Sequence, residues 1–373
     1  MNAAPLHPTL ARRDFLKFGM LAGVVAAMGY GAFEFAPWLD YDANATVPRR
    51  PFPRGAVGMP RLRALVRYAS LAASGHNTQP WKFAIQPDAI EIRPDFSRRL
   101  PVVDPDDREM WISVGCALEN LLVAARASGL APQVEFHLGA DMIHVSLTAD
   151  TPVAGPAFDA IALRQNTRSR YNGRIVVGSE LDQLRLVPLE PGIGVHYALG
   201  PGEMKPLVEY VHRANMEQYA DPAFLKELIS WVRFNKREAL ASLDGLYAPC
   251  AGSPEVPRWL GQLIVTGIPP QQQADADTLK LRSSPGAFVI TSDADDKAAW
   301  VRTGQAYERL ALKLTSLGIC SAFLNQPNEM PGLRAQFQTA LGLGAALPQL
   351  LVRFGHAKLL PHSPRRPVEQ FLA

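Results

Sequence analysis

A repeated helical segment is the feature that most constrains the fold of this 373-residue chain. Gly115–Leu121 and Gly304–Leu310 share Gly, Ala, Glu and Leu in phase, and Gly129 and Gly318 close the two copies at the same offset. Apolar residues recur at helical spacing in both, and the closing glycines suit a helix C-cap with positive φ. Two amphipathic helices can resemble each other by chance, but five identities in phase favour a duplication. We therefore predict an α+β fold built from two related halves.

The segments around each copy predict strands and mark the halves. Ranges with β-rich composition are 81–86, 89–93, 133–138, 142–147, 286–291, 322–324 and 350–354. Residues 203–244 predict helices with a start at Asp221-Pro222, and residues 245–275, rich in Pro, Gly and Gln, predict a lid insertion. The predicted division is a terminal segment 1–45, a first half 46–155 and a second half 156–373.

Composition excludes several classes of protein. The net charge of +3 gives no basis for nucleic acid as a partner. Cys116, Cys250 and Cys320 form no Cys-x-x-Cys pair, and no His cluster has metal-ligand spacing, so we predict no metal site. Three cysteines exclude a disulfide framework, although one bridge is compatible with them.

The amino terminus resembles a twin-arginine export signal. Residues 12–17 read Arg-Arg-Asp-Phe-Leu-Lys, and an apolar Gly- and Ala-rich stretch runs from Phe18 to about Phe33. The resemblance implies that the twin-arginine export machinery carries the folded protein to the periplasm or cell envelope. Ala43-Asn44-Ala45 fits a cleavage site, and the alternatives are a retained anchor, which would be the chain's one contact with the membrane, or an ordinary amphipathic helix. The apolar stretch is shorter than the span of about 20 residues that a membrane requires.

Two polar segments are candidate binding elements. The first, from Ser74 to Trp81, follows a predicted helix at 61–73 and presents Ser, His and amide side chains in a loop before Pro and a large aromatic. Such a loop can offer amides to a planar polar ring, or it can be a helix C-cap with an apolar anchor. The second, from Arg164 to Tyr171, holds three arginines, whose guanidinium groups suit a phosphate, or it is a solvated basic turn. A third basic element is the proline-bracketed pair Arg365 and Arg366 near the C-terminus.

Together these segments resemble the FMN-dependent nitroreductase family over residues 46–373. The loop is similar to its Ser-x-x-Asn-x-Gln-Pro-Trp element, the Arg cluster to its Arg-rich first motif, and the tail to its closing Pro-Arg-Arg-Pro. The family binds FMN between two subunits. One chain here carries both halves, as in the fused, single-chain group typified by the mycobacterial Acg proteins. The resemblance implies one FMN per chain at an intrachain pseudo-dimer interface.

The resemblance also implies the site residues. The side chains expected to bind FMN are Arg164, Asn166, Arg168, Arg365 and Arg366 at the phosphate, and Ser74, His76, Asn77 and Gln79 at the ribityl chain or ring. Gly75 replaces a frequent Ser of the family. No catalytic side chain is implied, because hydride enters the flavin at N5 and passes, as hydride or electrons, to a bound acceptor.

Two functions follow from the resemblance. The first is an oxidoreductase that reduces a nitro, quinone or similar small-molecule electron acceptor with NAD(P)H. The alternative is a flavin-binding storage protein, or a redox partner of the cell envelope, with a lid over the flavin. Export would complicate the first function, because nicotinamide cofactors are scarce outside the cytoplasm. The insertion at 245–275 favours the alternative if it covers the flavin face. A structural protein with a decayed site is a third reading, against which the complete loop and Arg clusters count.

Overall fold

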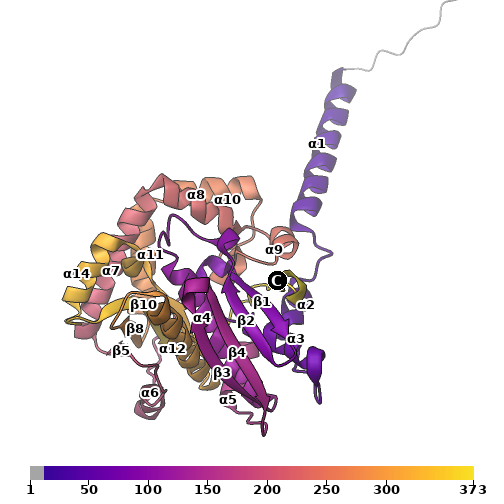
Figure 1. Ribbon diagram of the computed structural model, residues 1–373. Helices are drawn as coiled ribbons and strands as arrows, with labels where there is room; N and C mark the ends of the chain where they lie inside the picture. The colour runs from indigo at the N-terminus through magenta and orange to yellow at the C-terminus, as the bar shows by residue number, and fades with distance from the viewer. Residues whose placement is uncertain (1–11) are drawn as a thin grey trace, which may run out of the picture.

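The computed structural model describes the backbone of residues 12–373 and the side chains from Gly23 onward. Helix α1 (Arg12–Phe35) projects from the body of the molecule (Figure 1). The side chains of the predicted twin-arginine motif lie outside the described residues, so that interpretation stays a prediction.

The first sheet is antiparallel and belongs to the N-terminal part of the chain. Its strands, in spatial order, are β1 (Trp81–Gln86), β2 (Ala89–Pro94), β4 (Met142–Ala149) and β3 (Leu130–His137). The two-residue turn at Pro87-Asp88 sets the register that places Trp81 opposite Pro94. Helices α3 (Gly58–Ala69) and α4 (Arg108–Ala127) pack against this sheet.

The second sheet is also antiparallel and is covered on both faces. Its strands, in spatial order, are β5 (Ile193–Ala198), β8 (Gly286–Ser292), β10 (Leu347–Gly355) and β9 (Cys320–Phe323). Phe288 and Ile290 face the core shared with α12 (Lys297–Ser316), whereas Ala287 and Val289 face a second core. That second core is built with α7 (Pro201–Ala220), α11 (Pro270–Arg282) and α14 (Pro331–Ala340). Cover on both faces explains why β8 is buried along its whole length and apolar from Gly286 to Ile290, rather than alternating between apolar and polar residues.

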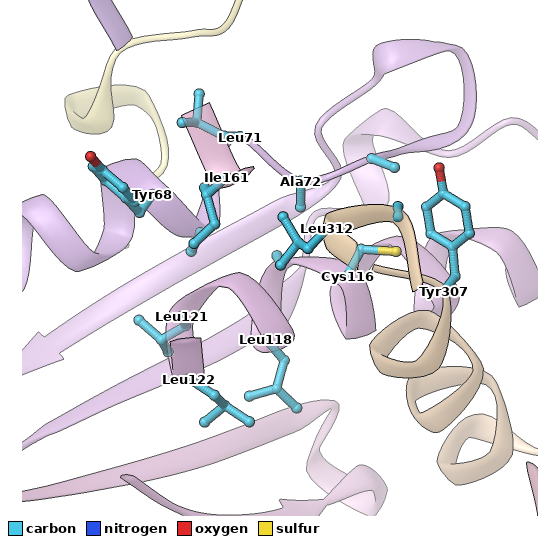
Figure 2. Packing of buried hydrophobic residues seen from close by; sticks show 14 of the residues in the cluster. Tyr68, Leu71, Ala72, Cys116, Leu118, Leu121, Leu122, Ile161, Tyr307 and Leu312 are labelled. Atoms are coloured by element: carbon cyan, nitrogen blue, oxygen red, sulfur yellow. The ribbon is translucent and has the colours of Figure 1, made fainter. Parts of the chain in front are cut away.

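The two repeated helices, α4 and α12, join the sheets by packing closely on each other. A Cβ atom at Gly115 would lie 2.0 Å from the Val301 carbonyl oxygen, and one at Gly304 would lie 2.0 Å from the Ile112 carbonyl oxygen. Each glycine therefore meets the carbonyl three residues before the other glycine, as two copies related by an approximate two-fold axis would. Figure 2 shows the core at this junction, where Cys116 of α4 lies near Leu312 and Tyr307 of α12.

The remaining elements connect and cover these layers. They are α2 (Tyr41–Thr46), α5 (Pro156–Leu163), α6 (Gly178–Arg185), α8 (Pro222–Trp231), β6 (Val232–Arg233), α9 (Lys236–Ser242), β7 (Leu246–Tyr247), α10 (Arg258–Gly267) and α13 (Gln326–Glu329). The C-terminal tail leaves β10 and crosses to the first sheet, where the Phe83 amide donates to the Phe371 carbonyl at 2.8 Å. The tail thereby ties the second half to the first.

The strands and the helix ends agree well with the sequence. All seven predicted strands are confirmed within a few residues, and Gly129 and Gly318 have φ of 81° and 71°, as a C-cap requires. Helix α3 ends at Ala69, four residues before the predicted end. Strand β5 and helices α10 and α14 were not predicted. Among the residues whose side chains the structure describes, from Gly23 onward, α4 alone is long and apolar enough to cross a membrane, and 83% of that apolar stretch is buried in the core.

Candidate functional site

The loop between α3 and β1 is strained and fixed by its own hydrogen bonds. His76, Asn77 and Gln79 all have positive φ, of 45°, 53° and 53°. Such a backbone is unusual for residues other than glycine and persists only where surrounding contacts hold it. The Ser74 hydroxyl accepts a hydrogen bond from the Gln79 amide at 3.1 Å. The loop therefore presents Ser74 and His76 outward in one defined conformation.

The amide side chains of this loop bind the C-terminal tail. Asn77 Oδ1 accepts from the Arg365 guanidinium at 2.8 Å, and Gln79 Oε1 accepts from the Arg366 amide at 2.9 Å. Arg365 also donates to the carbonyls of Ser70, Leu71 and Ala72, which are left free at the end of α3. These four side chains are buried behind the loop and each has a protein partner. In the structure these four side chains connect the loop to the tail and do not line the cavity described below; their contact with FMN stays a prediction.

A cavity of about 530 Å³ lies beside the loop. Its walls come from loop residues Ser74–His76, from α4, from the second sheet and from the segment 219–268. That segment includes the predicted lid residues Leu246 and Val256, and also Phe224, Leu228 and Phe234, which precede the predicted lid. A cavity of this size with mostly apolar walls and a few polar groups is typical of a cofactor or small-molecule site.

The cavity wall contains three cationic side chains. They are Arg168, Lys280 and Arg353, and the Asp277 carboxylate, which also lines the cavity, lies 2.9 Å from Lys280 Nζ. Arg353 donates to the Ser169 carbonyl at 2.8 Å and stacks on the Tyr171 ring, so it holds the backbone of the Arg cluster. No carboxylate among the described residues lies within ion-pair distance of Arg168. Loss of hydration lowers the pKa of the Arg168 guanidinium, so an anionic ligand would relieve a real electrostatic cost.

The other predicted residues of the Arg cluster have partners away from the cavity. Arg164 is buried with Nε 2.8 Å from Glu308 Oε1, and it donates to the Leu71 carbonyl at 3.0 Å. Asn166 Oδ1 accepts from the Tyr307 hydroxyl at 3.1 Å, and its backbone forms a bridge with Ser321. These contacts attach the cluster to α12 and β9. The structure therefore brings Ser74, His76 and Arg168 to the cavity wall and does not bring Arg164 or Asn166 there.

A pair of partly buried carboxylates in the cavity wall was not predicted. Glu109, in the first turn of α4, and Glu329 of α13 both line the cavity, and burial followed by the charge of Glu329 raises the pKa of Glu109 to about 8. The Asn325 amide and the Arg108 guanidinium donate to the Glu109 carboxylate. Lys280, Arg353 and this pair lie on elements whose local sequence is ordinary, so no motif marks them.

Several polar atoms in the wall have no partner among the described residues. They are His76 Nδ1, Arg353 Nε and Gln326 Oε1. Burial, together with Arg168, lowers the pKa of His76 to about 4, so its ring is neutral at physiological pH and offers one donor and one acceptor. Cationic, neutral polar and apolar walls together fit FMN, which carries a phosphate, a hydroxylated chain and a flat ring system.

The three cysteines are buried and free in the structure, and the described residues contain no cluster of metal-binding side chains. The disulfide that the spacing allowed is therefore not formed.

Two curated relatives of this chain carry names of the same class of protein. No protein-family model matches the sequence. The chain is 26% identical over 325 residues to the protein Rv3131 of Mycobacterium tuberculosis, provisionally named an NAD(P)H nitroreductase; the match covers 83% of this chain and 90% of that protein. It is 24% identical over 322 residues to the similarly named acg protein of the same species, covering 83% and 94%.

Among solved structures, the FMN-dependent nitroreductase NfnB from Mycobacterium smegmatis, crystallised with NADPH, shares 16% identity at a TM-score of 0.40. The match covers 58% of this chain and 96% of that chain. A TM-score this low adds no argument about function. The sequence similarity supports a nitroreductase-like oxidoreductase as the class of protein.

Proposed function

We propose that this chain is an FMN-dependent oxidoreductase of the nitroreductase type, with its flavin in the cavity between α4, the second sheet and the lid segment. The observation that carries the proposal is Arg168, a cation without a carboxylate partner among the described residues, in a cavity that also exposes the loop at Ser74 and His76. Arg168 is partly buried, and a cation that has lost part of its hydration without gaining a partner is costly unless a ligand pairs with it.

Different residues of the cavity wall would contact different parts of FMN. The Arg168 guanidinium would hold the phosphate, since it can donate in parallel to two oxygens, and the Lys280 ammonium and the Arg353 Nε–H would add positive charge and one further donor. Ser74 and the neutral His76 would meet polar edges of the cofactor, and the apolar lid side chains would exclude water. When bound, FMN supplies hydride and electron transfer to a nitro, quinone or similar acceptor.

The fold also supports a single flavin in one chain. The reciprocal contacts of Gly115 and Gly304 match the repeat seen in the sequence, which favours an internal pseudo-dimer. The sequence has one Ser-x-x-Asn-x-Gln-Pro-Trp loop, so the pseudo-dimer would hold one complete site. We further propose export by the twin-arginine route, based on residues 12–17.

A second function, flavin binding without nicotinamide turnover, is favoured by the lid. Apolar side chains from α8, from Phe234 and from α10 line one side of the cavity, where NAD(P)H would otherwise approach the flavin. In that case the protein would store flavin or exchange electrons with a component of the cell envelope.

The spectrum of the purified full-length chain tests the proposal. We expect flavin absorption bands, either as isolated or after added FMN, and loss of colour when NADPH is added without oxygen. Colour that persists with NADH and NADPH but disappears with dithionite would select the second function. A colourless protein that takes up no FMN would contradict both.

A further inference from the structure

The end of helix α1 is built into the body of the protein. Glu34 is buried, and its carboxylate accepts from Asn235 Nδ2 and from the Arg258 amide, each at 3.1 Å. The Arg237 guanidinium lies 3.5 Å from the same carboxylate and 4.0 Å from the centre of the Phe33 ring. Because the Arg258 amide is at the start of α10, Glu34 fixes the C-terminal end of α1 to the N-terminus of α10.

The residues after α1 are equally well packed. Tyr41 is buried, donates to the His362 carbonyl at 2.6 Å and packs on Tyr247 with ring centres 4.3 Å apart. The predicted cleavage site at 43–45 lies inside α2, and Ala45 is 2% exposed. A peptidase needs an extended, accessible peptide, which this segment does not offer. Cleavage there would also remove Glu34 and Tyr41 from the fold.

Helix α10 is apolar on two opposite faces. Gly261 and Val265 line the cavity, whereas Trp259 and Leu263, four residues apart on one stripe, are 59% and 64% exposed. Gln262 and Thr266 lie between the two apolar faces, and large apolar side chains exposed together on the outer face mark a contact surface for a partner or a membrane. Figure 1 shows α10 on the side of the body from which α1 projects.

The exposed stripe of α10 lies beside a second apolar surface. Val24, Val25, Met28 and Phe33 of α1, and Trp38 just after it, are also exposed. Trp259 directly follows Arg258, whose amide binds Glu34, so the N-terminal end of α10 lies at the C-terminal end of α1. The apolar stretch of α1, 16 residues from Phe18 to Phe33, is about 24 Å long as a helix, which is most of the hydrocarbon thickness of about 30 Å.

We propose that α1 is retained as a membrane anchor and that Glu34 holds α10 on the surface of the same bilayer, with Trp259 and Leu263 at the level of the lipid headgroups. Tryptophan is enriched at that depth because its ring is apolar and its N–H is polar. The proposal goes beyond flavin binding and does not depend on it. It assigns the outer face of the lid to the bilayer and its inner face to the cavity.

Two measurements on the full-length chain test this proposal. First, the intact mass of protein isolated from membranes should include α1; a chain that begins after Ala45 would overturn the retained anchor. Second, the protein is inserted in phosphatidylcholine–phosphatidylglycerol vesicles whose phosphatidylcholine chains are brominated, and quenching of tryptophan emission is measured. Bromine quenches only tryptophans that reach the lipid.

Matched variants identify the tryptophan that is quenched. Trp259→Phe should lose a large share of the quenched emission, whereas Trp300→Phe, on α12, should lose none. Leu263→Glu, at an exposed position that does not threaten folding, should also reduce the quenching. Unchanged quenching in both Trp259→Phe and Leu263→Glu would show that α10 does not touch the bilayer, even if α1 is inserted. Neither measurement requires bound FMN, so failure here is distinct from failure of the proposed function.

Discussion

Replacing Arg168 by Ala tests the assignment of the phosphate site and separates it from its neighbour Arg164. A charge-assisted hydrogen bond contributes about 1.5–3 kcal/mol, so the dissociation constant for FMN should rise about 10- to 150-fold. Riboflavin, which has no phosphate, should bind almost as before. Arg168 has no carboxylate partner among the described residues, so its loss should leave the stability of the apoprotein unchanged or slightly higher.

Arg164→Ala should behave in the opposite way. It leaves the fully buried Glu308 carboxylate without its cation. Breaking a buried ion pair in this way typically costs about 3–5 kcal/mol of stability. The free energy of unfolding of the apoprotein should fall accordingly, with no selective loss of FMN over riboflavin. Urea unfolding and flavin fluorescence titrations measure the two quantities, and exposed Arg170→Ala is the matched control. Equal losses of FMN and riboflavin binding in Arg168→Ala, or destabilisation like that of Arg164→Ala, would refute the assignment.

Four other predictions follow from the structure and sequence. Gly304→Ala places a Cβ 2.0 Å from a carbonyl oxygen and should lower the free energy of unfolding by at least about 1–3 kcal/mol. Gly332→Ala, with open space around it, should be neutral or stabilising. Equal shifts of the melting temperature in the two variants would contradict the close crossing of α4 and α12. The pKa of Glu109 is raised from its ordinary value of 4.5 to about 8 in the folded chain, so the free energy of unfolding of the wild type should fall as the pH rises from about 5 to 8. In Glu109→Gln, urea unfolding should show a smaller fall over the same pH range. A fall as large as in the wild type would count against the raised pKa. Saturated protein should release one flavin per chain from a monomer, and two per chain would exclude the single-site pseudo-dimer. Arg12→Lys with Arg13→Lys should leave the flavin-bound protein in the cytoplasm, and an unchanged envelope location would rule out twin-arginine export.

The sequence alone determined the elements whose signals are local. Hairpin β1–β2 follows from two β-rich segments around Pro87-Asp88, and the ends of α4 and α12 follow from glycines that adopt positive φ. The repeat of those helices was visible because their close crossing requires glycine at the same position in both copies. Backbone conformation at such positions depends on a few neighbouring residues, which is why these predictions held.

Only the tertiary structure decided which arginine faces the cavity. Arg164 and Arg168 belong to one cluster and look equivalent in the sequence, yet Arg164 pairs with Glu308 and Arg168 lines the cavity. Likewise, the amides of Asn77 and Gln79 bind the tail rather than the cavity. Lys280, Arg353 and Glu109 reach the cavity from three separate elements, and no local pattern marks them. The side on which a polar side chain is buried depends on partners more than a hundred residues away, and only the packing of α12, the tail and the lid brings those partners into place.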